Sequence, residues 1–136
     1  YTEAYENLGD AYVMTEQFDS AAKYYDGLML KNGKSAPLMI KLGNVNFGKK
    51  DTLQAISCFE EATKLDTTSI EALNKLANVT GMYGQYSQSN QAFARIARLS
   101  PNDPSPYKMM YTNYQLLGDS VNMKIAAQEY YKRGGK

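Results

Sequence analysis

The apolar residues of this chain recur with the spacing of amphipathic helices. One set near the start is Tyr5, Leu8, Gly9 and Tyr12. A second set is Phe18, Ala21, Tyr25 and Leu28. Positions separated by three, four and seven residues share one face of a helix, so each set predicts a helix with one buried side. No segment keeps the alternation that a half-buried strand needs.

The same spacing returns with a period of 34 residues. Shifting the chain by that length aligns Leu8-Gly9 with Leu42-Gly43, Leu76-Ala77 and Met110-Tyr111. It also aligns Tyr25 with Phe59, Phe93 and Ala127. Four such units account for the 136 residues, at about 2–35, 36–69, 70–103 and 104–136. We therefore predict an all-α fold of eight helices in four antiparallel hairpins, within one domain over residues 1–136 that is a fragment of a longer protein.

Short polar links separate the predicted helices. Within units they are Thr15-Glu16-Gln17, Lys49-Lys50-Asp51, Gly84-Gln85 and Gly118-Asp119. Glycine there supplies the positive φ that ends a helix. Between units, Ser, Thr or Asp precede the next helix, where their side chains can cap it.

These units resemble tetratricopeptide repeats. The resemblance rests on Leu-Gly or Leu-Ala, then a Tyr, then an Ala, then an aromatic residue at a constant phase. The matching residues of the first unit are Tyr5, Leu8, Gly9, Tyr12, Ala21 and Tyr25. The resemblance implies a right-handed superhelix whose first helices line a concave face.

The later units depart from the family pattern in places. Asn46 and Thr80 replace the Tyr, and Ser89 replaces the Ala. In the fourth unit Tyr111 stands where a small residue is usual and Ala127 where an aromatic is usual. Bulk has thus been exchanged between the two helices of that unit.

One column of polar residues stands at the same phase of the first helices: Asp10, Asn44, Asn78 and Thr112. Side-chain amides donate and accept hydrogen bonds, so the column suits the backbone of an extended peptide. The alternative interpretation is that these residues only tolerate solvent on an open face.

Lysines and apolar residues lie beside this column. Lys41, Lys75 and Lys108 could pair with carboxylates, or could be ordinary solvated residues. Phe47 and Met82 could add apolar contacts, or could belong to the core. The resemblance places these positions on the concave face and so implies a peptide-binding groove formed by Asp10, Lys41, Asn44, Phe47, Lys75, Asn78, Met82, Lys108 and Thr112.

Composition narrows the classes of function. The formal net charge is +1, which does not fit a dedicated nucleic-acid binder. The chain has no His and one Cys, Cys58, so we expect no catalytic residues, no metal site and no cofactor. No apolar run is long enough for membrane insertion. A single Cys fits the cytoplasm, which we favour, and also the periplasm.

The main hypothesis is a non-enzymatic scaffold that binds a protein or peptide in its groove. The alternative is a structural unit that self-associates as a homo-oligomer or stacks within a longer repeat scaffold. The net charge is −3 for residues 1–34 and +3 for residues 104–136. This asymmetry would favour head-to-tail contacts between copies; the alternative is a chance distribution of charges. We expect Val121, Ile125 and Tyr130 to stay partly exposed, and residues 132–136 to be frayed.

Overall fold

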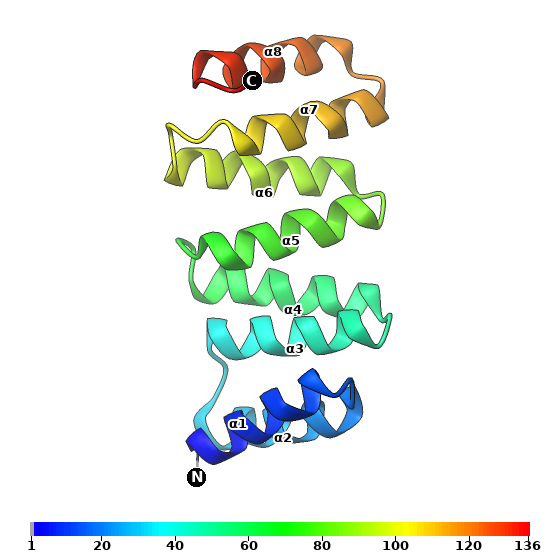
Figure 1. Ribbon diagram of the computed structural model, residues 1–136, viewed down its shortest axis with the longest axis vertical. Coiled ribbons are helices and arrows are strands. Elements are labelled where there is room, and N and C mark those ends of the chain that lie inside the picture. Colours follow the sequence, from blue (N-terminus) through cyan, green and yellow to red (C-terminus); the bar gives the residue numbers. More distant parts are fainter. Residues whose placement is uncertain (1) are drawn as a thin grey trace. The chain divides into compact units, whose positions relative to one another are not determined.

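The computed structural model describes residues 2–136 and contains eight helices (Figure 1). They are α1 (Thr2–Met14), α2 (Phe18–Asn32), α3 (Ala36–Gly48), α4 (Thr52–Leu65), α5 (Ile70–Met82), α6 (Tyr86–Leu99), α7 (Ser105–Leu117) and α8 (Ser120–Lys132). The described residues contain no strand. The predicted all-α class and the predicted number of helices are therefore confirmed.

The chain divides into two compact units, residues 1–67 and residues 68–136. In the first unit α1 packs against α2 and α3 against α4, and α2 also contacts α3. In the second unit α5 packs against α6 and α7 against α8, and α6 also contacts α7. Each unit is thus two helical hairpins joined through the second helix of one and the first helix of the next.

Side-chain caps begin four of the helices. The Ser35 and Ser69 hydroxyls accept hydrogen bonds from the backbone N–H of Leu38 and Ala72, at 3.3 and 3.1 Å. Asp51 and Asp119 cap α4 and α8 in the same way. These bonds satisfy backbone donors that a helix leaves unpaired at its start. The caps at Ser35 and Ser69 confirm the predicted capping between units, whereas the Asp51 and Asp119 caps lie within units, where the sequence pattern predicted none.

The turn inside every hairpin contains one residue in the left-handed region. Gly84 and Gly118 adopt φ values of 90° and 72°, as predicted for these glycines. Glu16 and Lys50 hold the equivalent places with φ values of 58° and 64°. The backbone geometry of the turn is therefore constant, although two of the four residues have a Cβ that disfavours it.

A small residue facing an aromatic ring holds each of the first two hairpins together. Tyr25 and Phe59 are each 1% exposed. A Cβ added at Gly9 would lie 2.5 Å from Cε1 of Tyr25, and a Cβ at Gly43 would collide with the ring of Phe59. The absence of a side chain on the first helix is therefore what makes room for the ring of the second.

The junction of α6 and α7 contains a buried polar network. The Asn113 amide donates to Ser89 Oγ and to Asn90 Oδ1, both at 2.9 Å. Ser89 Oγ in turn donates to the carbonyl of Ala77 at 2.7 Å. Asn90 Nδ2 is buried and has no hydrogen-bond partner among residues 2–136. At the equivalent places of the α2–α3 junction stand Ala21, Ala22 and Val45.

The end of the described chain differs from the expectation of fraying. The backbone N–H groups of Gly134 and Gly135 donate to the carbonyls of Tyr131 and Tyr130, both at 3.0 Å, so the chain folds back beyond α8. Gly134 allows this turn through its φ of 85°. Val121 and Ile125 on α8 are 68% and 50% exposed, as predicted.

The glycine–ring contact predicts opposite effects for one substitution at two sites. Gly43→Ala should lower the free energy of unfolding by about 1–3 kcal/mol, because the methyl group collides with the Phe59 ring. Gly27→Ala should raise it by up to about 1 kcal/mol, because alanine favours the helix and Tyr5 lies 3.6 Å away. Urea unfolding of both variants measures this, and a gain for Gly43→Ala would contradict it.

The polar network between α6 and α7 predicts that one substitution lowers the free energy of unfolding and that two further substitutions restore it. Asn113→Val should cost about 1–3 kcal/mol of unfolding free energy, because it leaves the buried Asn90 Oδ1 unpaired. The triple variant Ser89→Ala, Asn90→Ala and Asn113→Val reproduces the residues of the α2–α3 junction. It should return to within about 1 kcal/mol of the wild type, because no unpaired polar group remains. Equal losses in both variants, measured by thermal unfolding, would show that the network is not what Asn113 stabilises.

Candidate functional site

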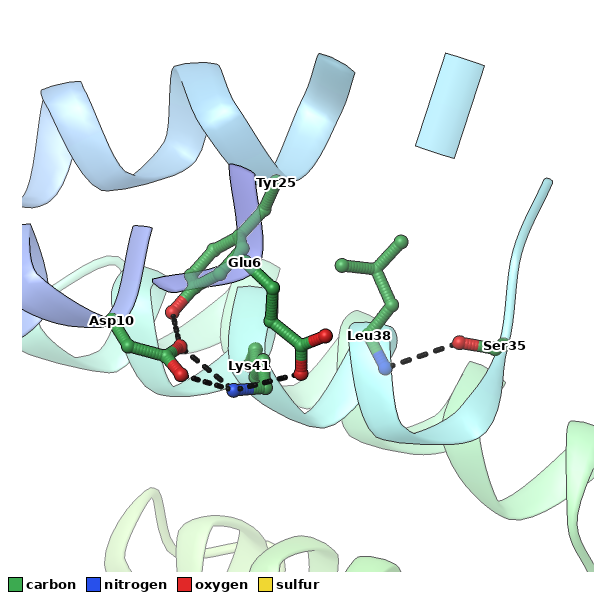
Figure 2. Close-up of polar contacts among 6 residues, drawn as sticks. All are labelled: Glu6, Asp10, Tyr25, Ser35, Leu38 and Lys41. Carbon is green, nitrogen blue, oxygen red and sulfur yellow. Dashed lines mark hydrogen bonds and ion pairs between the residues drawn. The ribbon is translucent and has the colours of Figure 1, made fainter. Parts of the chain in front are cut away.

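Two of the predicted groove residues form an ion pair that joins the first and second hairpins. Lys41 Nζ on α3 lies 2.7 and 2.9 Å from the carboxylate oxygens of Asp10 on α1 (Figure 2). The same ammonium group lies 3.4 Å from Oε1 of Glu6, one turn earlier on α1. The charge of Lys41 is thus matched within the protein, by two carboxylates of the same unit.

A buried phenol completes this cluster. The Tyr25 hydroxyl donates a hydrogen bond to Asp10 Oδ1. Burial raises the pKa of Asp10, but hydrogen bonds from Lys41 and Tyr25 outweigh it and leave the pKa below its ordinary value of 3.8. Burial and the bond to Asp10 raise the pKa of Tyr25. The sequence pattern placed Asp10 in a column of peptide-binding residues and did not predict its bonds to Lys41 and Tyr25. Two carboxylates one turn apart, Glu6 and Asp10, indicated that a cation could lie between them.

Asn44 is the first column residue whose amide is unused. Asn44 is half-buried on α3, and its side-chain amide has no hydrogen-bond partner among residues 2–136. Phe47 lies three residues further along the same helix face and is 39% exposed. The structure therefore excludes Phe47 from the core and leaves a free amide next to an exposed ring.

The same combination of a free amide and an exposed apolar side chain recurs on α5, within residues 68–136. Asn78 is exposed and, like Asn44, has no hydrogen-bond partner within the described chain. Met82, one turn later, is 72% exposed. Lys75, one turn earlier, is half-buried and forms no ion pair with residues 2–136. One helix face therefore presents a cation, an amide and an apolar side chain in succession.

The last two predicted groove residues lie on α7. Lys108 and Thr112 are both exposed, and Lys108 has no ion-pair partner within the described residues. The Thr112 hydroxyl donates to the backbone carbonyl of Lys108 at 3.3 Å, so it keeps only its acceptor capacity for a ligand.

Few described side chains are arranged in a way that would support catalysis or metal binding. Cys58 is 4% exposed, and burial raises the pKa of its thiol. Asn46, at a place where the family pattern has a Tyr, directs its amide at Cys58 Sγ at 3.6 Å. Over residues 2–136 no group of three His, Cys, Asp or Glu side chains is arranged to hold a metal ion. None of the helices described has the length and apolar character that crossing a bilayer demands.

The Asp10 cluster predicts a pH-dependent effect of one substitution. A carboxylate with a lowered pKa stabilises the fold at neutral pH and loses this contribution as the pH falls below 3.8. Asp10→Asn should therefore lower the unfolding free energy by about 1 kcal/mol at pH 7, since its side chain is partly exposed. The difference from the wild type should be smaller at about pH 3, because a falling pH protonates an increasing fraction of Asp10 in the wild type.

Urea unfolding at the two pH values measures this difference. Asp26→Asn is the matched control, because Asp26 is exposed and forms no ion pair among residues 2–136, and it should change neither value. A loss for Asp10→Asn of equal size at both pH values would contradict the electrostatic account.

Comparison with known proteins agrees with this architecture. The family model described as Tetratricopeptide repeat matches residues 2–28 and 36–69. No curated protein sequence matches the chain. Crystallised MamA superposes with a TM-score of 0.83 at 20% identity, over 97% of this chain and 77% of that chain.

Two further solved structures have the same fold. YrrB, a TPR protein with an unusual peptide-binding site, gives a TM-score of 0.79 at 16% identity over 98% of this chain and 69% of that chain. The CopN–Scc3 complex gives 0.66 at 23% identity over 72% of this chain and 58% of that chain. The family match in the first two repeats and the fold match over nearly the whole chain lead to one conclusion: residues 2–28 and 36–69 match the tetratricopeptide repeat family, and the chain has the fold of tetratricopeptide repeat proteins.

Proposed function

We propose that this chain is a non-enzymatic interaction module whose first helices bind an extended segment of a partner protein. The observation that carries the proposal is the pair of unpartnered amides, Asn44 and Asn78, at identical phase in successive repeats. An amide can donate to a backbone carbonyl and accept from a backbone N–H, so it binds peptide backbone without regard to sequence.

Apolar and cationic neighbours would supply selectivity. Phe47 and Met82 are exposed one turn beyond the two amides, where they would contact side chains of the ligand. Lys75 and Lys108 are available to carboxylates, because no acidic side chain of the described chain pairs with them. Lys41 contributes less, since Glu6 and Asp10 already hold its ammonium group.

The proteins of similar fold point in the same direction. YrrB has a peptide-binding site, and Scc3 forms a complex with CopN. Proteins of this fold thus include one with a peptide-binding site and one found in a protein complex. The particular residues proposed for this chain rest on its own free amides.

Selection of binding peptides followed by substitution tests the proposal. Peptides that bind the wild-type chain would be selected from a random display library. Their affinities for the wild type and for the Asn44→Ala/Asn78→Ala variant would then be compared. Loss of two amides, each making hydrogen bonds of about 1 kcal/mol, should weaken binding by about 10-fold or more.

The matched control is Gln91→Ala/Gln128→Ala, which removes two exposed amides from the second helices α6 and α8. It should leave the affinity unchanged. The proposed site is refuted if none of the selected peptides binds the Asn44→Ala/Asn78→Ala variant more weakly than the wild type.

Self-association is the second candidate function, and the charge distribution favours it. Residues 1–34 carry a net charge of −3 and residues 104–136 a net charge of +3, so opposite ends of two copies attract each other. Sizing of the chain at low and high salt distinguishes this candidate. Oligomers at low salt that dissociate at high salt support it, and a monomer in both conditions excludes it.

A further inference from the structure

The fourth hairpin reverses the pairing that holds the other hairpins together. In the first three, a small residue on the first helix accompanies a buried ring on the second: Gly9 with Tyr25, Gly43 with Phe59, and Ala77 with Phe93. In the fourth, Tyr111 stands on α7 and Ala127 on α8. The ring now starts from the first helix, and the second helix has only a methyl group where a ring is buried elsewhere.

A surface cavity of about 460 Å³ lies beside this reversed pair. Its lining residues are Lys108, Tyr111, Ala127, Tyr130, Tyr131 and Lys136. This volume falls within the range of about 300–1,000 Å³ that is usual for ligand pockets. The folded-back end of the chain forms part of the rim, where the Lys136 N–H donates to the Tyr130 hydroxyl at 3.2 Å.

The lining combines aromatic rings with positive charge. Tyr130 and Tyr131 stand edge to face, with centroids 5.3 Å apart and an interplanar angle of 70°. Three tyrosines and an alanine favour a flat or bulky apolar group. Lys108 and Lys136 are exposed, and the lining includes no carboxylate.

Glu129, the acidic residue of α8, is already paired with Arg133. Glu129 accepts a hydrogen bond from Arg133, whose guanidinium also lies 4.5 Å from the centroid of the Tyr107 ring. The two cavity lysines therefore have no carboxylate of this unit to pair with among the described residues, within a stretch of net charge +3. Charge complementarity selects an anionic partner for this surface.

We propose that this cavity, which we term the α7–α8 pocket, binds a bulky apolar side chain flanked by carboxylates in an acidic segment of a partner protein. The apolar side chain would lie against Ala127 and the tyrosine rings, and the carboxylates would pair with Lys108 and Lys136. The pocket shares Lys108 with the proposed groove but needs neither Asn44 nor Asn78, so it does not rest on the groove.

Fluorescence anisotropy of defined peptides tests the pocket. The probe is a short labelled peptide with one phenylalanine flanked on both sides by glutamates. One comparison peptide has serine in place of the phenylalanine, and another has lysines in place of the glutamates. The probe should bind the full chain at least 10-fold more tightly than either comparison peptide. Equal affinity for the phenylalanine and serine peptides would overturn the proposal.

A variant that restores the usual pairing tests the location. Tyr111→Ala/Ala127→Phe reproduces the Ala77 and Phe93 pair of the third hairpin and should fill the pocket. It should keep its helical circular dichroism and weaken probe binding at least 10-fold. If it does not fold, Tyr131→Ser serves instead, because that ring is 66% exposed and contributes little to the core. Wild-type affinity in the folded variant would overturn the proposal.

Charge variants separate the pocket from general attraction and from the groove. Lys136→Glu should weaken probe binding, whereas Lys124→Glu, the same charge change on α8 outside the lining, should not. Asn44→Ala/Asn78→Ala should bind the probe as the wild type does. Loss of probe binding in that variant would place the probe in the groove and overturn the pocket, while leaving the proposed function standing.

Discussion

The fold of the first two hairpins depends on steric complementarity between a small residue and a ring. Gly9 and Gly43 lack the Cβ that would collide with Tyr25 and Phe59, so the paired helices can approach closely. Close approach buries the ring almost completely, and Tyr25 and Phe59 are the two largest fully buried side chains among the described residues. Where the fourth hairpin reverses the pair at Tyr111 and Ala127, a cavity appears.

The polar side chains on the first helices divide into two groups with different roles. Asp10 and Lys41 satisfy each other and connect α1 to α3, so their charges serve the structure of the first unit. Asn44 and Asn78 occupy the same phase as Asp10 and yet have no hydrogen-bond partner within residues 2–136. A free polar group costs nothing while it is solvated and gains hydrogen bonds when a ligand arrives, which is the property expected of a binding residue.

Much of this could be predicted from the sequence, because a fixed period constrains every repeat at once. The eight helices, their caps at Ser35 and Ser69 and the buried Tyr25 and Phe59 all follow from local pattern. The Asp10–Lys41 pair could not, since it depends on how far one hairpin is rotated against the next. The sequence pattern also missed the buried hydrogen bonds of Asn113. They become visible only once the structure shows that its repeat position is buried, as it is at the equivalent Val45.

The buried amides of Asn90 and Asn113 also bear on how similar hairpins find their proper neighbours. Modules of one length and shape can be assembled in the wrong order or exchanged between chains. A hairpin with Val45 in place of Asn113 would fit the surface of Ser89 and Asn90 in shape but leave Asn90 without its donor. The α6–α7 contact thus discriminates against a mismatched module by the cost of dehydrated, unsatisfied groups, and so helps to encode the order of the array.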